Sequence, residues 1–90
     1  MNKTEFIEAI AENADVPKTT AAKVFDSMVD VVSSRLKDGE QITLIGFGTF
    51  LVRHREARKG RNPRTGAEIE IKASNVPSFK AGKALKDAVN

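Results

Sequence analysis

The segment from residue 53 to residue 66 carries the side chains best suited to chemistry in this chain. Six of its first twelve residues are Lys or Arg, against one acid, Glu56. A charge run this dense repels itself unless it meets a polyanion. Asn62, Pro63 and Gly66 follow the order of a tight turn, so the segment is predicted to be a hairpin with its tip there. A basic hairpin with almost nothing apolar to bury must project from the core, which suits the backbone of a nucleic acid.

Charge is divided unevenly along the chain, although the formal total is only +3. Residues 1–52 hold five Lys/Arg and eight Asp/Glu, whereas residues 53–90 hold ten and four. Such asymmetry favours a large anionic partner. No apolar run approaches the roughly 18 residues of a membrane span, and Lys3, Glu5 and Glu8 interrupt any signal peptide. A cytoplasmic or nucleoid protein without a membrane partner is therefore expected.

Catalysis and metal binding find little support in the composition. The chain has no cysteine and one histidine, His54. Disulfides, thiolate chemistry, Cys–His catalysis and Cys- or His-cluster metal sites are thereby excluded. Glu68 and Glu70 alternate along an expected strand and do not form a catalytic pair. We expect no catalytic residue, metal or cofactor; a carboxylate-based metal nuclease is the catalytic alternative, and nothing in the sequence favours it.

Two helices are predicted in the first 38 residues. Asn2 followed by Glu5 has the form of a capping box, and apolar residues then recur at helical spacing, which predicts a helix over 3–14. Pro17 suits the start of a second helix, over 18–37, which ends at Asp38-Gly39.

Strands are predicted from Gln41 onward, where the apolar period becomes two. Glycines inside this pattern indicate a turn, between a short strand at 41–45 and a second strand that starts near 48 and continues into the basic arm. The chain returns as a strand over 67–73. Residues 76–79 are predicted to be a connector, and a short helix follows.

Helices followed by strands indicate an α+β fold with a three-stranded antiparallel sheet and a protruding β-ribbon arm. The chain, 1–90, is expected to form one domain. Its parts are a helical base (1–38), a sheet (41–79) with an arm at about 53–74, and a C-terminal helix (81–90). By parity Arg53, Arg55, Lys59 and Arg61 share one face of the arm. Whether Ile69 and Ile71 share that face depends on the hairpin register.

Several candidates have an ordinary structural interpretation beside the functional one. Pro63 suits position i+1 of a turn, but a proline at the tip of an arginine-rich ribbon also suits a wedge between base steps. Lys80, Lys83 and Lys86 recur every three residues, as in any solvated helix, yet beside the arm they would extend a track of phosphate contacts.

The chain is also expected to self-associate. Without the arm, a body of about seventy residues buries too little surface to be very stable alone, and no disulfide or metal supports it. We predict a dimer whose interface includes Phe47, Phe50 and Phe79. These rings suit a core or an interface better than base stacking, since the chain has no Trp or Tyr.

The chain resembles the bacterial histone-like HU family. The resemblance is carried by Gly46-Phe47-Gly48-Thr49-Phe50, by the run Arg58 to Gly66, and by the two ends, Met1 to Glu5 and Val76 to Lys83. It covers essentially all 90 residues without an insertion. It implies an intertwined homodimer, or a heterodimer with a paralogue, whose two β-arms embrace double-stranded DNA through the minor groove.

The resemblance places the family's arm-tip proline at Pro63, which would intercalate between base pairs. Many relatives have a neutral Gln where this chain has Arg64, so the tip carries an added charge. The residues expected to bind DNA are Arg53, Arg55, Arg58, Lys59, Arg61, Asn62, Pro63, Arg64, Lys80, Lys83, Lys86 and Lys3.

The function that follows is sequence-independent binding and bending of DNA, with a preference for bent, nicked or gapped duplex. Phosphate contacts would supply affinity, and the ease of deformation would supply selectivity. A subunit of integration host factor, the sequence-specific relative, is the alternative within the family; the lack of terminal extensions favours HU. A basic RNA-binding module is the alternative outside it.

Overall fold

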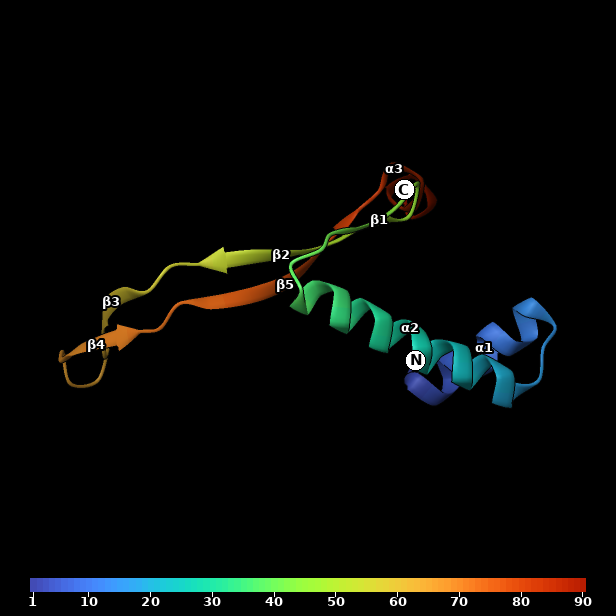
Figure 1. Ribbon diagram of the computed structural model, residues 1–90, viewed down its shortest axis with the longest axis horizontal. Coiled ribbons are helices and arrows are strands. Elements are labelled where there is room, and N and C mark those ends of the chain that lie inside the picture. Colours follow the sequence, from blue (N-terminus) through green and yellow to red (C-terminus); the bar gives the residue numbers. More distant parts are fainter. The chain divides into compact units, whose positions relative to one another are not determined.

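The computed structural model describes residues 1–90 and divides into two compact units, Met1–Ser34 and Arg35–Asn90. The fold is α+β, as the sequence predicts (Figure 1). In chain order the elements are α1 (Lys3–Ala14), α2 (Lys18–Lys37), β1 (Ile42–Leu44), β2 (Gly48–Arg55), β3 (Arg58–Arg61), β4 (Glu68–Ile71), β5 (Ser74–Ala81) and α3 (Lys83–Ala88). None of the helices combines the length and apolar character needed to cross a bilayer.

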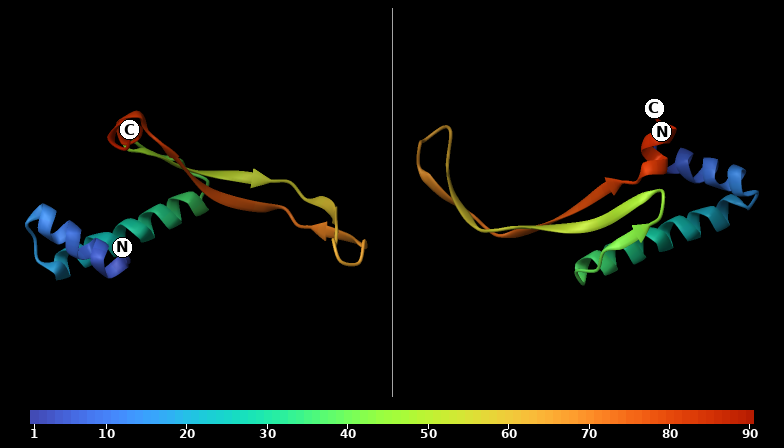
Figure 2. Two further views of the ribbon diagram at one scale, coloured as in Figure 1. Left: turned by 180° about the vertical axis from the view of Figure 1, so that it is seen from behind. Right: turned by 90° about the horizontal axis from the view of Figure 1, so that it is seen from above.

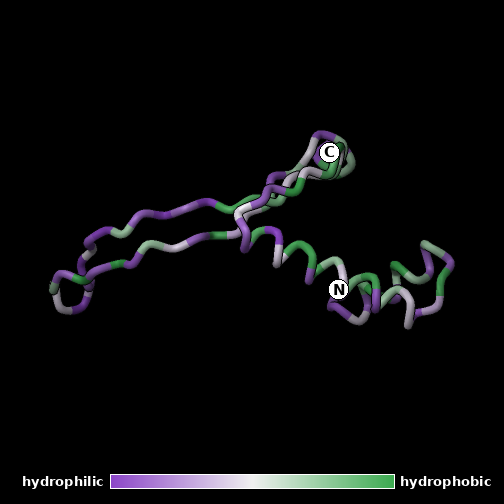
Figure 3. Tube along the Cα trace, viewed as in Figure 1, coloured by the Kyte–Doolittle hydropathy of each residue, from purple (hydrophilic) through white to green (hydrophobic).

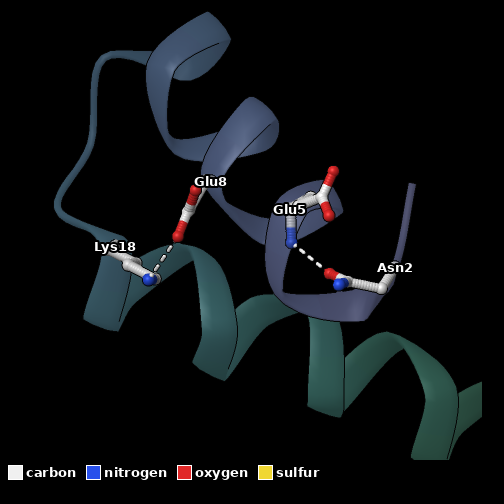
Figure 4. A network of polar contacts seen from close by, with 4 residues as sticks. All are labelled: Asn2, Glu5, Glu8 and Lys18. Carbon is white, nitrogen blue, oxygen red and sulfur yellow. Dashed lines mark hydrogen bonds and ion pairs between the residues drawn. The ribbon is translucent and has the colours of Figure 1, made fainter.

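The first unit is a helical hairpin whose ends are set by polar contacts (Figure 4). The Glu5 amide donates to Asn2 Oδ1 at 2.9 Å, which confirms the predicted N-terminal cap of α1. Asp15 ends α1 in the left-handed region, with φ 55°. Lys18 Nζ then lies 2.7 Å from Glu8 Oε1, so an ion pair joins the start of α2 to the middle of α1.

The core of this helical hairpin is small. Only Ile7, Ala11 and Ala21 are buried hydrophobic residues in the whole chain. Phe25 packs against this cluster, and its ring meets that of Phe6 edge to face with centroids 5.8 Å apart. Three buried side chains provide too little apolar burial to hold a domain of this size together.

The second unit contains a three-stranded antiparallel sheet in the order β1-β2-β5. The turn between β1 and β2 is where the glycines predict it. Gly46 has φ 86°, and the Phe47 amide donates to the Leu44 carbonyl at 3.0 Å. Position 48, the first residue of β2, must be a glycine, because a Cβ there would collide with the Phe79 ring and come within 2.7 Å of the Lys80 carbonyl oxygen.

The prediction that residues 76–79 form a connector is wrong, since they lie within β5. Phe79 pairs with Phe50 and Pro77 pairs with Val52. The connector was predicted because of Pro77, since a proline usually interrupts a strand. However, β5 is an edge strand, and a proline is tolerated there because its nitrogen can face away from the neighbouring strand.

The C-terminal helix is also shorter than predicted, because Ala81 still pairs with Gly48 and α3 begins at Lys83. Two backbone hydrogen bonds attach this end to the β1–β2 turn. The Gly82 amide donates to the Phe47 carbonyl at 2.8 Å, and the Leu85 amide donates to the Gly46 carbonyl at 3.2 Å. The sheet, the turn and α3 therefore form one assembly within the second unit.

Replacing Gly48 with alanine should destabilise the sheet, because the new methyl group would overlap the Phe79 ring and the Lys80 carbonyl. We expect a loss of about 2–3 kcal/mol in the free energy of unfolding. Gly66→Ala is the matched control. The φ of Gly66 is 70°, but no atom lies within 4 Å of the position that an added Cβ would take, so backbone strain alone should cost about 1 kcal/mol. Denaturant unfolding followed by circular dichroism measures both; equal losses would contradict the predicted clash.

Candidate nucleic-acid interface

The basic arm is one β-hairpin with a continuous register. At the end of the first ladder Arg55 lies opposite Ser74, and at the start of the second Arg58 lies opposite Ile71. Two residues on each side, 56–57 and 72–73, separate the ladders, so neither side carries an insertion. The strands stay side by side from the sheet to the tip and the ribbon curves along its length (Figures 1 and 2).

The register decides which side chains share a face of the arm. Lys59 lies opposite Glu70 and Arg61 opposite Glu68. Ile69 and Ile71 pair instead with Gly60 and Arg58, so the two isoleucines lie on the face opposite Lys59 and Arg61. Ile71 rests over Gly60, where a Cβ would come within 3.1 Å of its Cδ1.

Most of the arm's positive charge has no acidic partner. Among the six cations between residues 53 and 64, only Lys59 forms an ion pair, 3.9 Å from Glu68 Oε1, and both of these side chains are largely exposed. Arg53, Arg55, Arg58 and Arg61 are all exposed. The ribbon is mostly hydrophilic along its length (Figure 3). An array of this kind attracts polyanions.

The predicted turn at the tip is confirmed and is held by hydrogen bonds. The Asn62 amide donates to the Ala67 carbonyl, and the Gly66 amide donates to the Asn62 carbonyl, both at 2.8 Å. Asn62 Oδ1 accepts a further bond from the Arg64 amide at 2.8 Å. Pro63 is left exposed between them. The structure thus places Asn62 in a role within the turn and leaves Pro63 and Arg64 exposed at the tip.

A polar cluster at the root of the arm was missed by the sequence reasoning. His54 Nδ1 lies 2.8 Å from Asn75 Oδ1, and His54 Nε2 lies 3.3 Å from Glu56 Oε1. His54 and Asn75 are 21 residues apart, and only the β2–β5 register brings them together. Lys72, between β4 and β5, is a further exposed cation of the arm that is not among the predicted DNA-binding residues.

The predicted DNA-binding cations outside the arm lie in two parts of the chain. Lys80, near the end of β5, and Lys83 and Lys86, on α3, gather at the end of the second unit away from the arm tip (Figure 1). Lys3 lies in the first unit. Its Nζ is 3.1 Å from Asp26 Oδ1 and 5.7 Å from the Phe25 ring centroid, so it is already engaged within the helical hairpin.

The three phenylalanines predicted at an interface lie together, Phe50 and Phe79 on the paired strands β2 and β5 and Phe47 in the turn before β2. The Phe79 ring centroid is 4.8 Å from that of Phe50 and 5.4 Å from that of Phe47. Nearly half of the Phe47 and Phe79 surfaces remains exposed, at 49% and 42%. This aromatic cluster is therefore formed within the chain but not covered by it.

Comparison with known proteins agrees with this geometry. The family model described as "Bacterial DNA-binding protein" matches residues 1–90. The chain belongs to this family. It is 62% identical over 89 residues to DNA-binding protein HU 1 of Bacillus subtilis, covering 99% of this chain and 97% of that one. It is 61% identical over 89 residues to DNA-binding protein HU-alpha of Vibrio proteolyticus, covering 99% of both.

A solved structure extends the similarity to the fold. An Anabaena HU–DNA cocrystal structure superposes with a TM-score of 0.90 at 43% sequence identity, covering 99% of this chain and 97% of that one. The membership in the bacterial DNA-binding family and the resemblance to HU seen in the sequence are thus confirmed.

Proposed function

We propose that the protein binds and bends double-stranded DNA without reading its sequence, as an architectural protein of the bacterial nucleoid. The observation that carries the proposal is the arm: a hairpin of continuous register with six cations, only one of them ion-paired, ending in an ordered turn that exposes Pro63. The HU–DNA cocrystal relative and the HU-named relatives support the same conclusion.

Affinity arises from the phosphates. The arm from Arg53 to Pro63 is long enough, at ~3.3 Å per residue, to follow a groove for roughly 35 Å. Side chains of its cations extend from both faces toward the strands of a duplex, and contacts of this kind carry no sequence information. The lysines of β5 and α3 continue the phosphate contacts over the body of the protein. The DNA-binding residues are Arg53, Arg55, Arg58, Lys59, Arg61, Asn62, Pro63, Arg64, Lys80, Lys83, Lys86 and Lys3.

Selectivity arises from deformation. An apolar ring inserted between base steps in the minor groove unstacks them at a cost of a few kcal/mol, and the extra contacts of the bent duplex offset that cost. Pro63 is exposed at a tip whose backbone is held by three hydrogen bonds, so its ring is presented in a fixed direction. DNA that is already bent, nicked or gapped costs less to deform and is bound better.

The DNA-binding form is a dimer, because the chain leaves apolar faces uncovered. On α2, one stripe that includes Ala21 and Phe25 packs against α1. A second stripe, Val24, Met28 and Val31, is exposed by 62%, 51% and 50%. Together with the aromatic cluster on the sheet, this is more apolar surface than a stable monomer exposes. A second copy of the chain, offering the same faces, covers it by two-fold symmetry.

The remaining assignments follow from this function. The chain acts as a single DNA-binding module, with a helical base, a sheet with its arm, and a C-terminal helix. Binding and bending need no cofactor, metal or catalytic residue, and the protein is not an enzyme. Its place is the cytoplasm, on the nucleoid. The partner subunit is a second copy, and a paralogous chain with the same faces would also fit.

The binding prediction concerns salt. Affinity for a linear duplex should fall steeply with salt concentration, with a slope of about −0.9 for each phosphate contacted. Arg61→Ala should make the slope shallower by about one or two units, because a dimer carries the residue twice. Arg35→Ala removes a cation of α2 that is not among the predicted DNA-binding residues, and it should leave the salt slope unchanged. Fluorescence anisotropy measures these slopes; a salt-insensitive affinity, or a marked preference for one sequence over its scrambled form, would contradict the proposal.

The assembly prediction concerns α2. Met28→Glu puts a charge into the exposed apolar stripe and should dissociate the dimer, since a buried unpaired charge costs several kcal/mol. Ser33→Glu adds the same charge to an exposed position of the same helix, about 140° from Met28 around its axis, and should be tolerated. Sedimentation at micromolar concentration reports the result. A stable folded monomer of the parent protein would show that the dimer is wrong.

The bending prediction concerns Pro63. Pro63→Ala keeps the cations and the Asn62 hydrogen bonds but removes the inserted ring. Binding to straight duplex should change little, whereas the bend and the preference for nicked or gapped DNA should shrink. Energy transfer between dyes at the two duplex ends measures the bend. A variant that bends DNA as strongly as the parent would exclude the wedge, and one that weakens all DNA forms equally would identify Pro63 as a turn former only.

A further inference from the structure

We propose that His54 is a further phosphate-binding residue, and that it contributes to DNA affinity only when its imidazole is protonated. The inference rests on the proposed DNA-binding function and adds to it a dependence on pH. It is carried by the geometry at the root of the arm, where His54 lies among the DNA-binding arginines but is held by its own polar partners.

Both ring nitrogens of His54 face oxygen atoms. Nδ1 lies 2.8 Å from the amide oxygen of Asn75, and Nε2 lies 3.3 Å from a carboxylate oxygen of Glu56. Neither an amide oxygen nor a carboxylate donates a hydrogen bond. With these two oxygen acceptors, both contacts are hydrogen bonds when each nitrogen carries a proton. The imidazolium therefore satisfies the site as it stands, whereas a neutral ring keeps both contacts only if the Asn75 amide turns to donate through its nitrogen.

Few other charges act on this ring from its own face of the ribbon. Across the strand the paired residue is Asn75, and the diagonal neighbours are Ala73 and Pro77, all uncharged. On β2 itself the neighbour toward the sheet is Val52. Strand β1 pairs with β2 only as far as Phe50 and does not reach the site.

The charged groups near His54 are therefore one acid and a set of cations. Glu56 is the acid on the same face, and its side chain is 88% exposed; Arg58 is the next charged residue on that face, beyond Glu56. Arg53 and Arg55 flank the histidine along β2 but alternate to the other face, and Lys72 follows them there in the returning strand. Because the His54–Glu56 pair is so exposed, it is weak, and a phosphate can compete for the imidazolium.

Protonation changes the charge at the root of each arm by one unit. With a neutral ring, Glu56 presents an uncompensated negative charge to the DNA. With an imidazolium, the His54–Glu56 pair is neutral before binding and offers a cation to a phosphate once DNA is present. A polyanion binds the protonated form better, so affinity rises as pH falls and the ring gains its proton, and this gain is lost as pH rises.

The composition makes this proton linkage unusually simple to isolate. The chain has one histidine and no cysteine. Between about pH 5.5 and pH 7.0, histidine is the side chain whose ordinary pKa falls in the window. A change in DNA affinity over that window therefore reports on one residue in each chain.

The experiment compares the full-length protein with three variants on one linear duplex, by fluorescence anisotropy at about pH 5.5 and pH 7.0 and constant ionic strength near 0.1 M. One phosphate contact at that salt corresponds to nearly tenfold in affinity when fully formed. The parent should therefore bind about threefold tighter, or more, at the lower pH for each arm engaged. The salt slope should also steepen, by up to about one unit for each arm.

The variants test the assignment to His54. His54→Gln should bind equally at both pH values, at the parent's weaker level. His54→Arg, permanently charged, should bind equally at both pH values, at the tighter level. Glu56→Gln removes the acid but keeps the histidine, so affinity should rise at both pH values while the pH effect persists. A purely structural histidine would not change the salt slope with pH.

Two failures are distinguishable. A parent that binds DNA with the same affinity and salt slope at both pH values, or a His54→Gln protein that retains the parent's pH effect, would overturn the role of His54 and leave the DNA-binding function intact. A parent that binds no duplex at either pH would overturn the proposed function itself.

Discussion

Backbone pairing between β2 and β5 is the interaction on which the rest of the second unit depends. The ladder runs from Gly48 opposite Ala81 to Arg55 opposite Ser74, and the β3–β4 ladder resumes in the same register beyond a two-residue gap. Hydrogen bonds of the main chain can hold this ribbon together without a hydrophobic core. The side chains of the arm are thereby free to be cationic, and the same register sets which of them face together.

Because the arm has no hydrophobic core, the protein as a whole buries little apolar surface. An arm without a core contributes little apolar burial, and the helical hairpin has only three buried hydrophobic residues. The aromatic cluster on the sheet and the second stripe of α2 are left exposed. These faces make sense together as halves of an interface, because a small domain without disulfides or metals gains the missing burial by association. The projecting arm and the exposed apolar faces are thus linked by one shortage of core, which the proposed association of two chains offsets.

Local patterns allowed most of this fold to be predicted. Periodicity and capping placed both long helices at their observed bounds, Lys3–Ala14 and Lys18–Lys37, because those signals act within one turn or two. What failed depended on neighbours distant in sequence. The sequence predicts a connector over residues 76–79 because the edge position that tolerates Pro77 is a property of the sheet and is not visible in the local sequence.

The site shows the same division. The residue types and their order were enough to locate the cations and the turn at the tip of the arm. The contacts between residues on two different strands required the strand register. The separation of the isoleucines from Lys59 and Arg61, and the contact of His54 with Asn75, follow from pairings that no single stretch of sequence contains.

The distribution of acids along the arm bears on how such a surface stays foldable without its ligand. Six cations confined to one ribbon repel each other, and at physiological salt a Debye length of about 8 Å leaves neighbours on one strand unscreened. Glu68 and Glu70 lie opposite Arg61 and Lys59, and Glu56 lies beside His54 at the root. All three are exposed, so they relieve the repulsion without forming strong ion pairs that DNA would have to break. Weak internal neutralisation keeps the free arm paired and still leaves its charge available to a phosphate backbone, which explains why acids occur on a surface whose function needs cations.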